Sequence, residues 1–569
     1  MNHAFKHHKT LPLAQLRIHY LLCLFVLCFS TLKIYGQIEV VRVKDINSGS
    51  ENGLIPYSFT DALVFNDLLF FKASDGIHGR ELWISDGTSE GTYMLKDIET
   101  DLSTVSPNSF TPYNGLVFFQ ADDGVWGREL WVTDGTEAGT ELFMDINEGN
   151  GHGSPLYFTE FDGKLYFGAN DGSHGQELWV SDGTVGGTYM LKDIRTGFGG
   201  SGPNHFTEFN GELYFKADDG VHGAELWKTD GTEAGTVMVK DINESGGGEP
   251  MYFIVFNDAL FFIVDDGIHG FELWKTDGTE AGTQMVKDSN PGAEGIVGGN
   301  FYAPPEPVVY NGKLYFASVN MEHLVFVLWS TDGTEAGTNK FELPDNTELW
   351  WPQDMTVFEG TLYFGAAIPD YGAELWRTDG TAAGTAMIKD INPGAGESYP
   401  RHFTPYNGNL YFTAADIDMD TQLWMTDGTE AGTLKITPVF ADQNDPVNMA
   451  WNLFREVGGK LLFPAWYEDI GYELYAVVDA AAVGIEGYLV ESTFKLYPNP
   501  ASDVLTLAFL SGVGAVDVKI FNSLGQLVLH RMDFGAELMQ IPIAHWHSGP
   551  YLLRVTSGGG SQTQTFIKF

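Results

Sequence analysis

Acidic side chains recur in two kinds of loop along the chain, and their oxygen atoms are the ligands that hard cations prefer. One loop reads Asp-Asp-Gly-x-His-Gly, and the other begins Asp-Ile-Asn. The candidate ligands are Asp122, Asp123, Asp218, Asp219, Asp265, Asp266, Asp145 and Asn147. Because Ca²⁺ takes six to eight oxygens, weak or shared Ca²⁺ sites are one interpretation and a solvated acidic face is the other. An EF-hand is excluded, since Leu156 stands at the twelfth position counted from Asp145, where that loop needs Glu.

Histidines and the usual catalytic residue types give weaker indications of a functional site than the acidic loops do. The loop histidines lie on separate repeats, whereas zinc needs three or four converging ligands. We therefore expect them to stabilise their own loops; they are His78, His174, His222 and His269. No Gly-x-Ser-x-Gly elbow lies on a strand-to-helix pattern, and nothing singles out one carboxylate pair among 76 acids. No catalytic or cofactor-binding residue is predicted, which leaves open whether the protein is an enzyme.

The elements that must position these loops repeat through the chain. The units recur about every 48 residues. Each one, such as residues 203–242, holds four short apolar runs, and an Asn-Gly pair or a relative of it separates the first two. That pair is typical of a tight β-hairpin. The units are marked by Trp83, Trp131, Trp179, Trp227, Trp274, Trp329, Trp376 and Trp424, with a degenerate ninth copy at Tyr475. We predict an all-β fold, a large β-propeller of about nine four-stranded blades, with eight possible.

Two further expectations concern the ring and its core. The last unit lacks a fourth strand, but residues 40–46 resemble one and could complete that blade, which would remove two exposed sheet edges. The repeated Trp is expected to pack between neighbouring blades. The Asp of each Asp-Gly-Thr-x-x-Gly-Thr turn is expected to bind backbone N–H groups of that turn.

The N-terminus and the overall charge bear on location. Residues 1–36 form a signal-peptide pattern, in which a basic segment precedes an apolar run too short to span a bilayer. Its removal would take four bases and both cysteines, changing the net charge from −45 to −49. So acidic a chain lacks the basic footprint that nucleic acid requires, and nucleic acid is excluded as a partner.

The C-terminal segment has a different composition. After the propeller, expected over 37–480, and a linker at 481–490, residues 491–569 carry short alternating strands that predict a small immunoglobulin-like β-sandwich. Its motif residues are Tyr497, Pro498, Asn499, Pro500, Gly525, Gly549 and Tyr551.

Two resemblances follow from these motifs. The repeats resemble the ELWxxDGT repeats of secreted bacterial proteins, and residues 491–569 resemble the type A C-terminal sorting domain of the type IX secretion system. The second resemblance implies Sec export, contact with the type IX machinery, and delivery outside the cell or to its outer surface. It also implies attachment to surface lipopolysaccharide as one outcome.

For function, these features favour non-catalytic binding or adhesion by the propeller, with a protein or glycan ligand. The alternative is a secreted polysaccharide-active enzyme, a glycoside hydrolase or lyase, on the same scaffold. A unit that carries function should break the repeat, which points first to residues 300–307 and 349–351.

Overall fold

The computed structural model describes residues 38–568 with internal gaps. The gaps are residues 50, 55–58, 100–106, 290, 292–304, 321–322, 324, 369, 418–420, 440–453, 468–470, 480–493, 498–501, 510–514, 523–526, 535–537, 548 and 558–559. The signal-peptide segment and the linker lie outside the described residues. The chain divides into two compact units, one up to Asp479 and one from Ala480. None of the described residues belongs to a helix that could cross a membrane.

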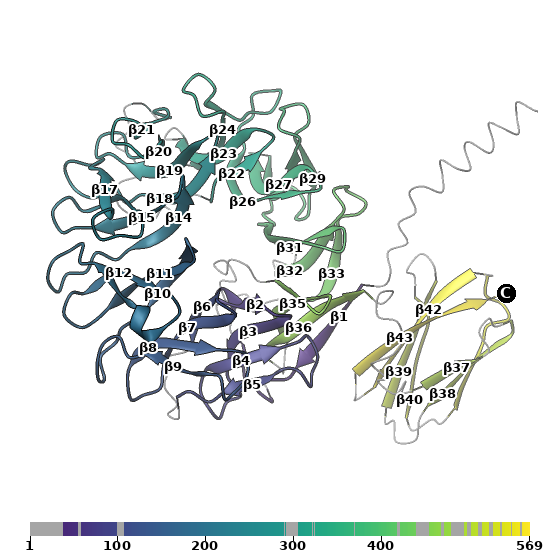
Figure 1. Cartoon of the computed structure of the whole chain (residues 1–569). Helices are drawn as coiled ribbons and strands as arrows, with labels where there is room; N and C mark the ends of the chain where they lie inside the picture. The colour runs from purple at the N-terminus through teal and green to yellow at the C-terminus, as the bar shows by residue number, and fades with distance from the viewer. Residues whose placement is uncertain are drawn as a thin grey trace, which may run out of the picture. The chain divides into compact units, whose positions relative to one another are not determined.

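The first unit is a propeller whose described residues form nine four-stranded antiparallel blades (Figure 1). The first strands are β2 (Leu63–Phe65), β6 (Asn108–Tyr113), β10 (Leu156–Phe161), β14 (Asn204–Phe209), β18 (Met251–Phe256), β22 (Val308–Tyr310), β26 (Trp350–Phe358), β30 (Arg401–Tyr406) and β34 (Arg455–Val457). The second strands are β3 (Leu68–Ala73), β7 (Leu116–Asp122), β11 (Lys164–Asn170), β15 (Glu212–Asp218), β19 (Ala259–Asp265), β23 (Lys313–Asn320), β27 (Thr361–Ile368), β31 (Asn409–Ala415) and β35 (Lys460–Tyr467).

The outer half of each blade completes the sheet. The third strands are β4 (Glu81–Ser85), β8 (Arg128–Thr133), β12 (Gln176–Ser181), β16 (Ala224–Thr229), β20 (Phe271–Thr276), β24 (Val325–Thr331), β28 (Tyr371–Thr378), β32 (Thr421–Thr426) and β36 (Gly471–Asp479). The fourth strands are β5 (Tyr93–Lys96), β9 (Glu141–Met144), β13 (Tyr189–Lys192), β17 (Val237–Lys240), β21 (Gln284–Met285), β25 (Asn339–Lys340), β29 (Ala386–Lys389), β33 (Leu434–Val439) and β1 (Ile38–Lys44). A short 3-10 turn, η2 (Val185–Gly187), lies between β12 and β13.

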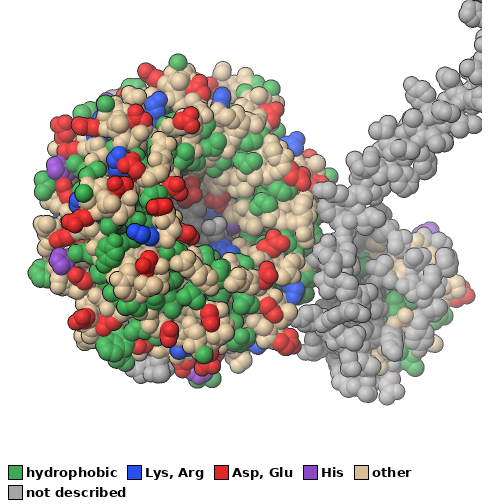
Figure 2. Space-filling view, in the orientation of Figure 1, with side chains coloured by type: hydrophobic (Ala, Val, Ile, Leu, Met, Phe, Trp, Pro, Cys, Tyr) green, Lys and Arg blue, Asp and Glu red, His purple; other side chains and the backbone are tan. Residues whose placement is uncertain are grey.

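The first strands surround the centre of the ring. Neighbouring first strands contact one another along the ring, for example β10 with β14, β14 with β18 and β26 with β30. The propeller is therefore a ring with a central channel lined by first strands, and the space-filling view shows it hollowed at the centre (Figure 2). The sixth and seventh blades share one sheet, because Val327 of β24 pairs with Trp350 of β26.

The predicted closure is confirmed. Strand β1 pairs antiparallel with β36, from Ile38 opposite Asp479 to Lys44 opposite Leu474. The N-terminal strand thus completes the blade formed by the last three strands, and β36 has a partner strand on both sides.

The hairpin turns are confirmed in all nine blades. Both central residues of each turn have positive φ, as at Asn210 (52°) and Gly211 (76°). Asn and Gly tolerate this conformation, and such a turn matches the twist of the two strands that it joins.

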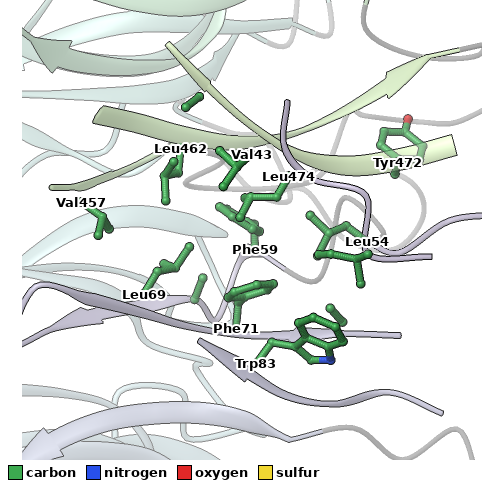
Figure 3. Packing of buried hydrophobic residues seen from close by; sticks show 14 of the residues in the cluster. Val43, Leu54, Phe59, Leu69, Phe71, Trp83, Val457, Leu462, Tyr472 and Leu474 are labelled. Atoms are coloured by element: carbon green, nitrogen blue, oxygen red, sulfur yellow. The ribbon is translucent and has the colours of Figure 1, made fainter. Parts of the chain in front are cut away.

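The repeated tryptophans pack between blades, as predicted. Trp131 belongs to the same buried cluster as Phe70 and Leu82 of the preceding blade, and the residue is 6% exposed. Figure 3 shows the equivalent cluster at the ring junction, where Trp83 and Phe71 lie in one cluster with Val457 and Leu474.

The Asp of each Asp-Gly-Thr turn binds groups of its own turn, as predicted. The Asp230 carboxylate accepts hydrogen bonds from the Thr232 N–H and hydroxyl at 2.9 and 2.7 Å. The second glycine of that turn, Gly235, is needed because a Cβ there would come within 2.0 Å of the same carboxylate.

The second unit is a sandwich of two sheets around one core. One sheet has the order β37-β38-β41 and the other β40-β39-β42-β43. The strands are β37 (Phe494–Tyr497), β38 (Val504–Phe509), β39 (Ala515–Asn522), β40 (Leu527–Phe534), β41 (Leu538–Pro542), β42 (Gly549–Ser557) and β43 (Gly560–Lys568). The buried core includes Leu505, Val518, Ile541 and Leu553.

Candidate functional site

Two sets of loops meet on one face of the propeller. In each case the segment that enters a blade's first strand accepts a backbone hydrogen bond from the loop between its second and third strands. The Asn170 N–H donates to the Gly153 carbonyl at 2.8 Å, and the Asp218 N–H donates to the Ser201 carbonyl at 3.0 Å. The acidic loops and the entrances to the first strands therefore share a face, as expected.

The predicted cation ligands do not gather there into one site. Most of these carboxylates bind groups close by. Four accept backbone N–H bonds within their own loops: Asp122 from Gly124, Asp123 from Val125 and Trp126, Asp265 from Gly267, and Asp145 from Gly149. Three pair with basic side chains: Asp218 with Arg195, Asp219 with His222 and Asp266 with His269. The amide nitrogen of Asn147 donates to the His152 carbonyl at 3.3 Å. Within the described ranges, no group of three or more His, Cys, Asp or Glu could hold a metal ion. Ca²⁺ binding stays a prediction.

The loop histidines cap their own turns. The imidazole Nδ1 of His222 lies 2.7 Å from the carboxylate of Asp219, and the same contact recurs in three other blades. The hydrogen bond to that carboxylate raises the pKa of the His222 imidazole. Each pair involves one blade, so the arrangement supports a loop and offers no converging ligand set.

Buried glutamates, which the sequence analysis missed, fasten the entrance segments. The Glu225 side chain is 0% exposed, and its two oxygens accept backbone N–H bonds from Ile242, Asn243 and Gly248 at 3.1, 3.2 and 2.9 Å. Equivalent carboxylates that accept backbone bonds are Glu81, Glu129, Glu177, Glu374 and Glu473. Desolvation by burial raises the pKa of Glu225 to about 7. The available signal was the spacing, because Glu stands two residues before six of the eight repeated Trp residues and so shares their strand face.

Strained backbone marks the beginning of the first strands. In five blades, the structure describes the four residues at the start of the first strand, and the second of these residues is Pro. The first and the last of the four residues have positive φ, and these φ angles lie between 45° and 61°. We call these the mouth segments; they are residues 154–157, 202–205, 249–252, 351–354 and 399–402. The strand pairing slips just after the third residue of each, as between Asn204 and Thr207. Such bulges re-aim side chains.

The mouth segments vary in sequence although the rest of the unit repeats. Their last residues are Tyr157, His205, Tyr252, Asp354 and His402. Positive φ is uncommon for bulky side chains and costs on the order of 1–3 kcal/mol per residue, so the surrounding blade must hold these residues in this conformation whichever side chain they carry.

The side chains of the mouth segments differ in how far the core buries them, since Tyr252 and Trp351 pack against a buried cluster whereas Tyr157 and Tyr399 are exposed. Tyr157 is 53% exposed. His205 is also exposed, yet the protein around it lowers the pKa of its imidazole by desolvation, as expected for a side chain on a channel wall. On the opposite arc, Arg401 donates to the amide oxygen of Gln353 at 2.9 Å and lies 5.8 Å from the Tyr399 ring centre.

One of the two pattern-breaking regions proposed from sequence lies at this mouth. Trp351 opens a mouth segment, and its ring lies 5.8 Å from that of Phe326. The ring of Trp350 lies 5.5 Å from the His323 imidazole. Most of residues 300–307 fall outside the described residues.

The motif residues of the C-terminal unit are described in part. Tyr497 ends β37, where it pairs with Thr506, and Gly549 begins β42. The Tyr551 hydroxyl donates to the His547 carbonyl at 2.9 Å, and its ring stacks on Phe566 at 5.5 Å. Pro498, Asn499, Pro500 and Gly525 lie outside the described residues.

Comparison with known proteins gives distant structural likenesses. No curated protein matches the chain. Among solved structures, it is similar to a prolyl endopeptidase, with 11% identity, a TM-score of 0.33, and coverage of 71% of this chain and 54% of that one. It is also similar to a puromycin hydrolase, with 13% identity, a TM-score of 0.32, and coverage of 65% of this chain and 61% of that one. The chain thus spans less than two thirds of either enzyme.

A third likeness covers nearly the whole chain. It is to the extracellular domain of a putative one-component system from B. thetaiotaomicron, with 8% identity, a TM-score of 0.28, and coverage of 92% of this chain and 95% of that one.

The C-terminal unit carries the one family match. Residues 495–568 match the secretion system C-terminal sorting domain, which confirms the resemblance expected for this segment. The resemblance to ELWxxDGT-repeat proteins stays a prediction. The sorting domain implies interaction with the type IX secretion machinery, and it indicates secretion to a cell-surface or extracellular location.

Proposed function

We propose that this exported protein binds a ligand at the channel mouth of its propeller and leaves that ligand chemically unchanged. One observation carries the proposal: the positions that vary within an otherwise repeated unit gather around the channel, on a backbone conformation that is the same in five blades. A constant scaffold with variable side chains at one place is the usual arrangement of a recognition surface.

The repeated positions have structural tasks that account for their repetition. Glu225 fastens an entrance segment, Trp227 fills the space between blades, and Asp230 orders a turn. The last residue of each mouth segment has no such common task, since it is Tyr, His or Asp in different blades. This contrast supports recognition at the mouth.

Contacts of the mouth carboxylates support binding rather than catalysis. Glu249 pairs with the Lys216 ammonium at 2.9 Å, and Asp354 accepts the backbone N–H of His402 at 2.6 Å. A general acid or base must exchange its proton with the substrate, and these two carboxylates are engaged with protein groups. Delivery would follow the type IX route, and attachment to surface lipopolysaccharide is part of the proposal.

The test compares the full-length protein with paired variants on surfaces coated with mucin, gelatin or yeast mannan. We expect retention on at least one surface, and a loss of about tenfold or more in affinity for the double variant Tyr157→Ala, His205→Ala. The control is Tyr93→Ala, Tyr189→Ala, which removes two tyrosines that are each 47% exposed on fourth strands at the outer edge of the ring.

Three results would decide against the proposal: no retention on any surface, equal losses for both double variants, or recovery of a cleaved ligand. Mass measurement of the eluted ligand detects cleavage, and cleavage products would instead support the polysaccharide-active enzyme.

A further inference from the structure

We infer that the ligand of the channel mouth is a neutral glycan chain, whose sugar rings stack on aromatic side chains of the mouth segments. The inference rests on the proposed function and names its ligand class. It is argued from the ring-bearing residues, the polar groups beside them and the charges around them.

A ring-bearing side chain is present in every mouth segment. The rings belong to Tyr157, His205, Tyr252, Trp351 and Tyr399, with a further imidazole at His402. Tyr157 is 53% exposed and Tyr399 is 39% exposed, whereas Tyr252 and Trp351 are half-buried against a core cluster and offer less of their faces. An aromatic ring offers a flat apolar face and, in Tyr, a polar tip. Sugars match this surface, because their C–H groups lie on the ring faces and their hydroxyls project from the edges.

Planar polar groups stand beside the aromatic faces. Arg401 and Gln353 are held together by a 2.9 Å hydrogen bond, and the guanidinium lies over Tyr399. Asn204 precedes His205 on a neighbouring arc of the channel. Fixed amide and guanidinium planes bond to pairs of adjacent oxygens, which is the pattern presented by neighbouring sugar hydroxyls.

The charges at the mouth favour a neutral ligand. Its carboxylates at Glu249 and Asp354 are engaged by Lys216 and by the His402 N–H, so they offer little to a basic peptide. A polyanion would meet the acidic loops on the same face of a chain whose net charge is −45. A sugar chain without charge needs no free carboxylate and is not repelled by the acidic loops.

The rings are spread around the channel rather than gathered into a cage. The five mouth segments belong to five different blades, and their starts are 48, 47, 102 and 48 residues apart in the chain. A cage for a single ammonium group would need rings around one point. Separate platforms instead suit several sugar units of one chain.

The experiment titrates the full-length protein with four neutral probes, maltohexaose, cellohexaose, mannohexaose and xylohexaose, and with two charged ones, octalysine and oligogalacturonate. We expect calorimetry to detect binding of at least one neutral probe, with a dissociation constant that changes less than about twofold when salt is raised. Tyr157→Ala and Tyr399→Ala should each weaken binding about tenfold, a change worth about 1.4 kcal/mol. The matched controls Tyr93→Ala and Tyr189→Ala should leave it within about twofold.

The outcomes separate this inference from the proposed function. If no neutral probe binds more tightly than about 1 mM, or if both pairs of variants lose binding equally, the glycan assignment is overturned. Binding of octalysine or oligogalacturonate that disappears in Tyr157→Ala would overturn the ligand class and leave the channel mouth as the site. Thermal melting checks that each variant is folded.

Discussion

Replacing Glu225 by alanine tests whether the buried carboxylates hold the entrance segments in place. The substitution removes the acceptor of three backbone N–H groups, those of Ile242, Asn243 and Gly248. These donors lie 17 to 23 residues further along the chain, in the segment that leads to the next blade. The carboxylate therefore joins the third strand of one blade to the start of the next.

The expected cost follows from the donors that are left without a partner. A buried donor without an acceptor costs about 1–3 kcal/mol, so three give about 3–9 kcal/mol. Water entering the vacated space would satisfy part of this demand, and we expect about 3 kcal/mol. Glu225→Gln should cost less, because the amide keeps one acceptor oxygen and the side-chain volume. Asp230→Ala in the same blade is the control; its carboxylate is exposed, water can replace it, and the loss should be much smaller.

Chemical denaturation and hydrogen exchange provide the assay. The free energy of unfolding should fall in the order wild type, Glu225→Gln, Glu225→Ala, and the amides of Ile242 and Gly248 should exchange faster in the alanine variant. If Glu225→Ala unfolds no more easily than Asp230→Ala, or if exchange at these amides is unchanged, the fastening role is wrong.

Four further predictions concern pH, closure, sorting and cations. Burial raises the pKa to about 7 for five glutamates, which are Glu81, Glu129, Glu225, Glu374 and Glu473. The folded protein therefore binds more protons than the unfolded chain between pH 4.5 and 7. The melting temperature should fall as the pH rises through this window, and a rise in melting temperature would refute the prediction. Deleting residues 37–47 removes β1 and two of the three backbone donors to Glu473, so the melting temperature should drop by roughly 5 °C or more, and an unchanged value would contradict the closure. Deleting residues 496–569 should leave a folded propeller in the periplasm, as judged by cell fractionation, whereas its normal appearance at the surface would count against the sorting role. Ca²⁺ should raise the melting temperature above that in Na⁺ of matched ionic strength, and equal values would dismiss the predicted sites.

The sequence alone determined the repeated architecture. Asn210-Gly211 and its equivalents specify hairpins because both residues tolerate positive φ, a property of the residues themselves. The missing fourth strand of the last unit predicted β1 as its replacement, since an unpaired edge in a closed ring would leave backbone groups without partners. The sorting domain was also recognisable, because its motifs are local.

The tertiary structure alone decided which side chains act together. Glu225 looked like one surface acid among many, but a neighbouring blade buries it and distant backbone donors engage it. The acidic loops left two interpretations open, shared cation sites or a solvated acidic face, and only the structure shows that Asp219 and its equivalents bind N–H groups and imidazoles within their own loops. The channel mouth could not be foreseen, because its segments are 47 to 102 residues apart in the chain and only closure of the ring brings them around one channel.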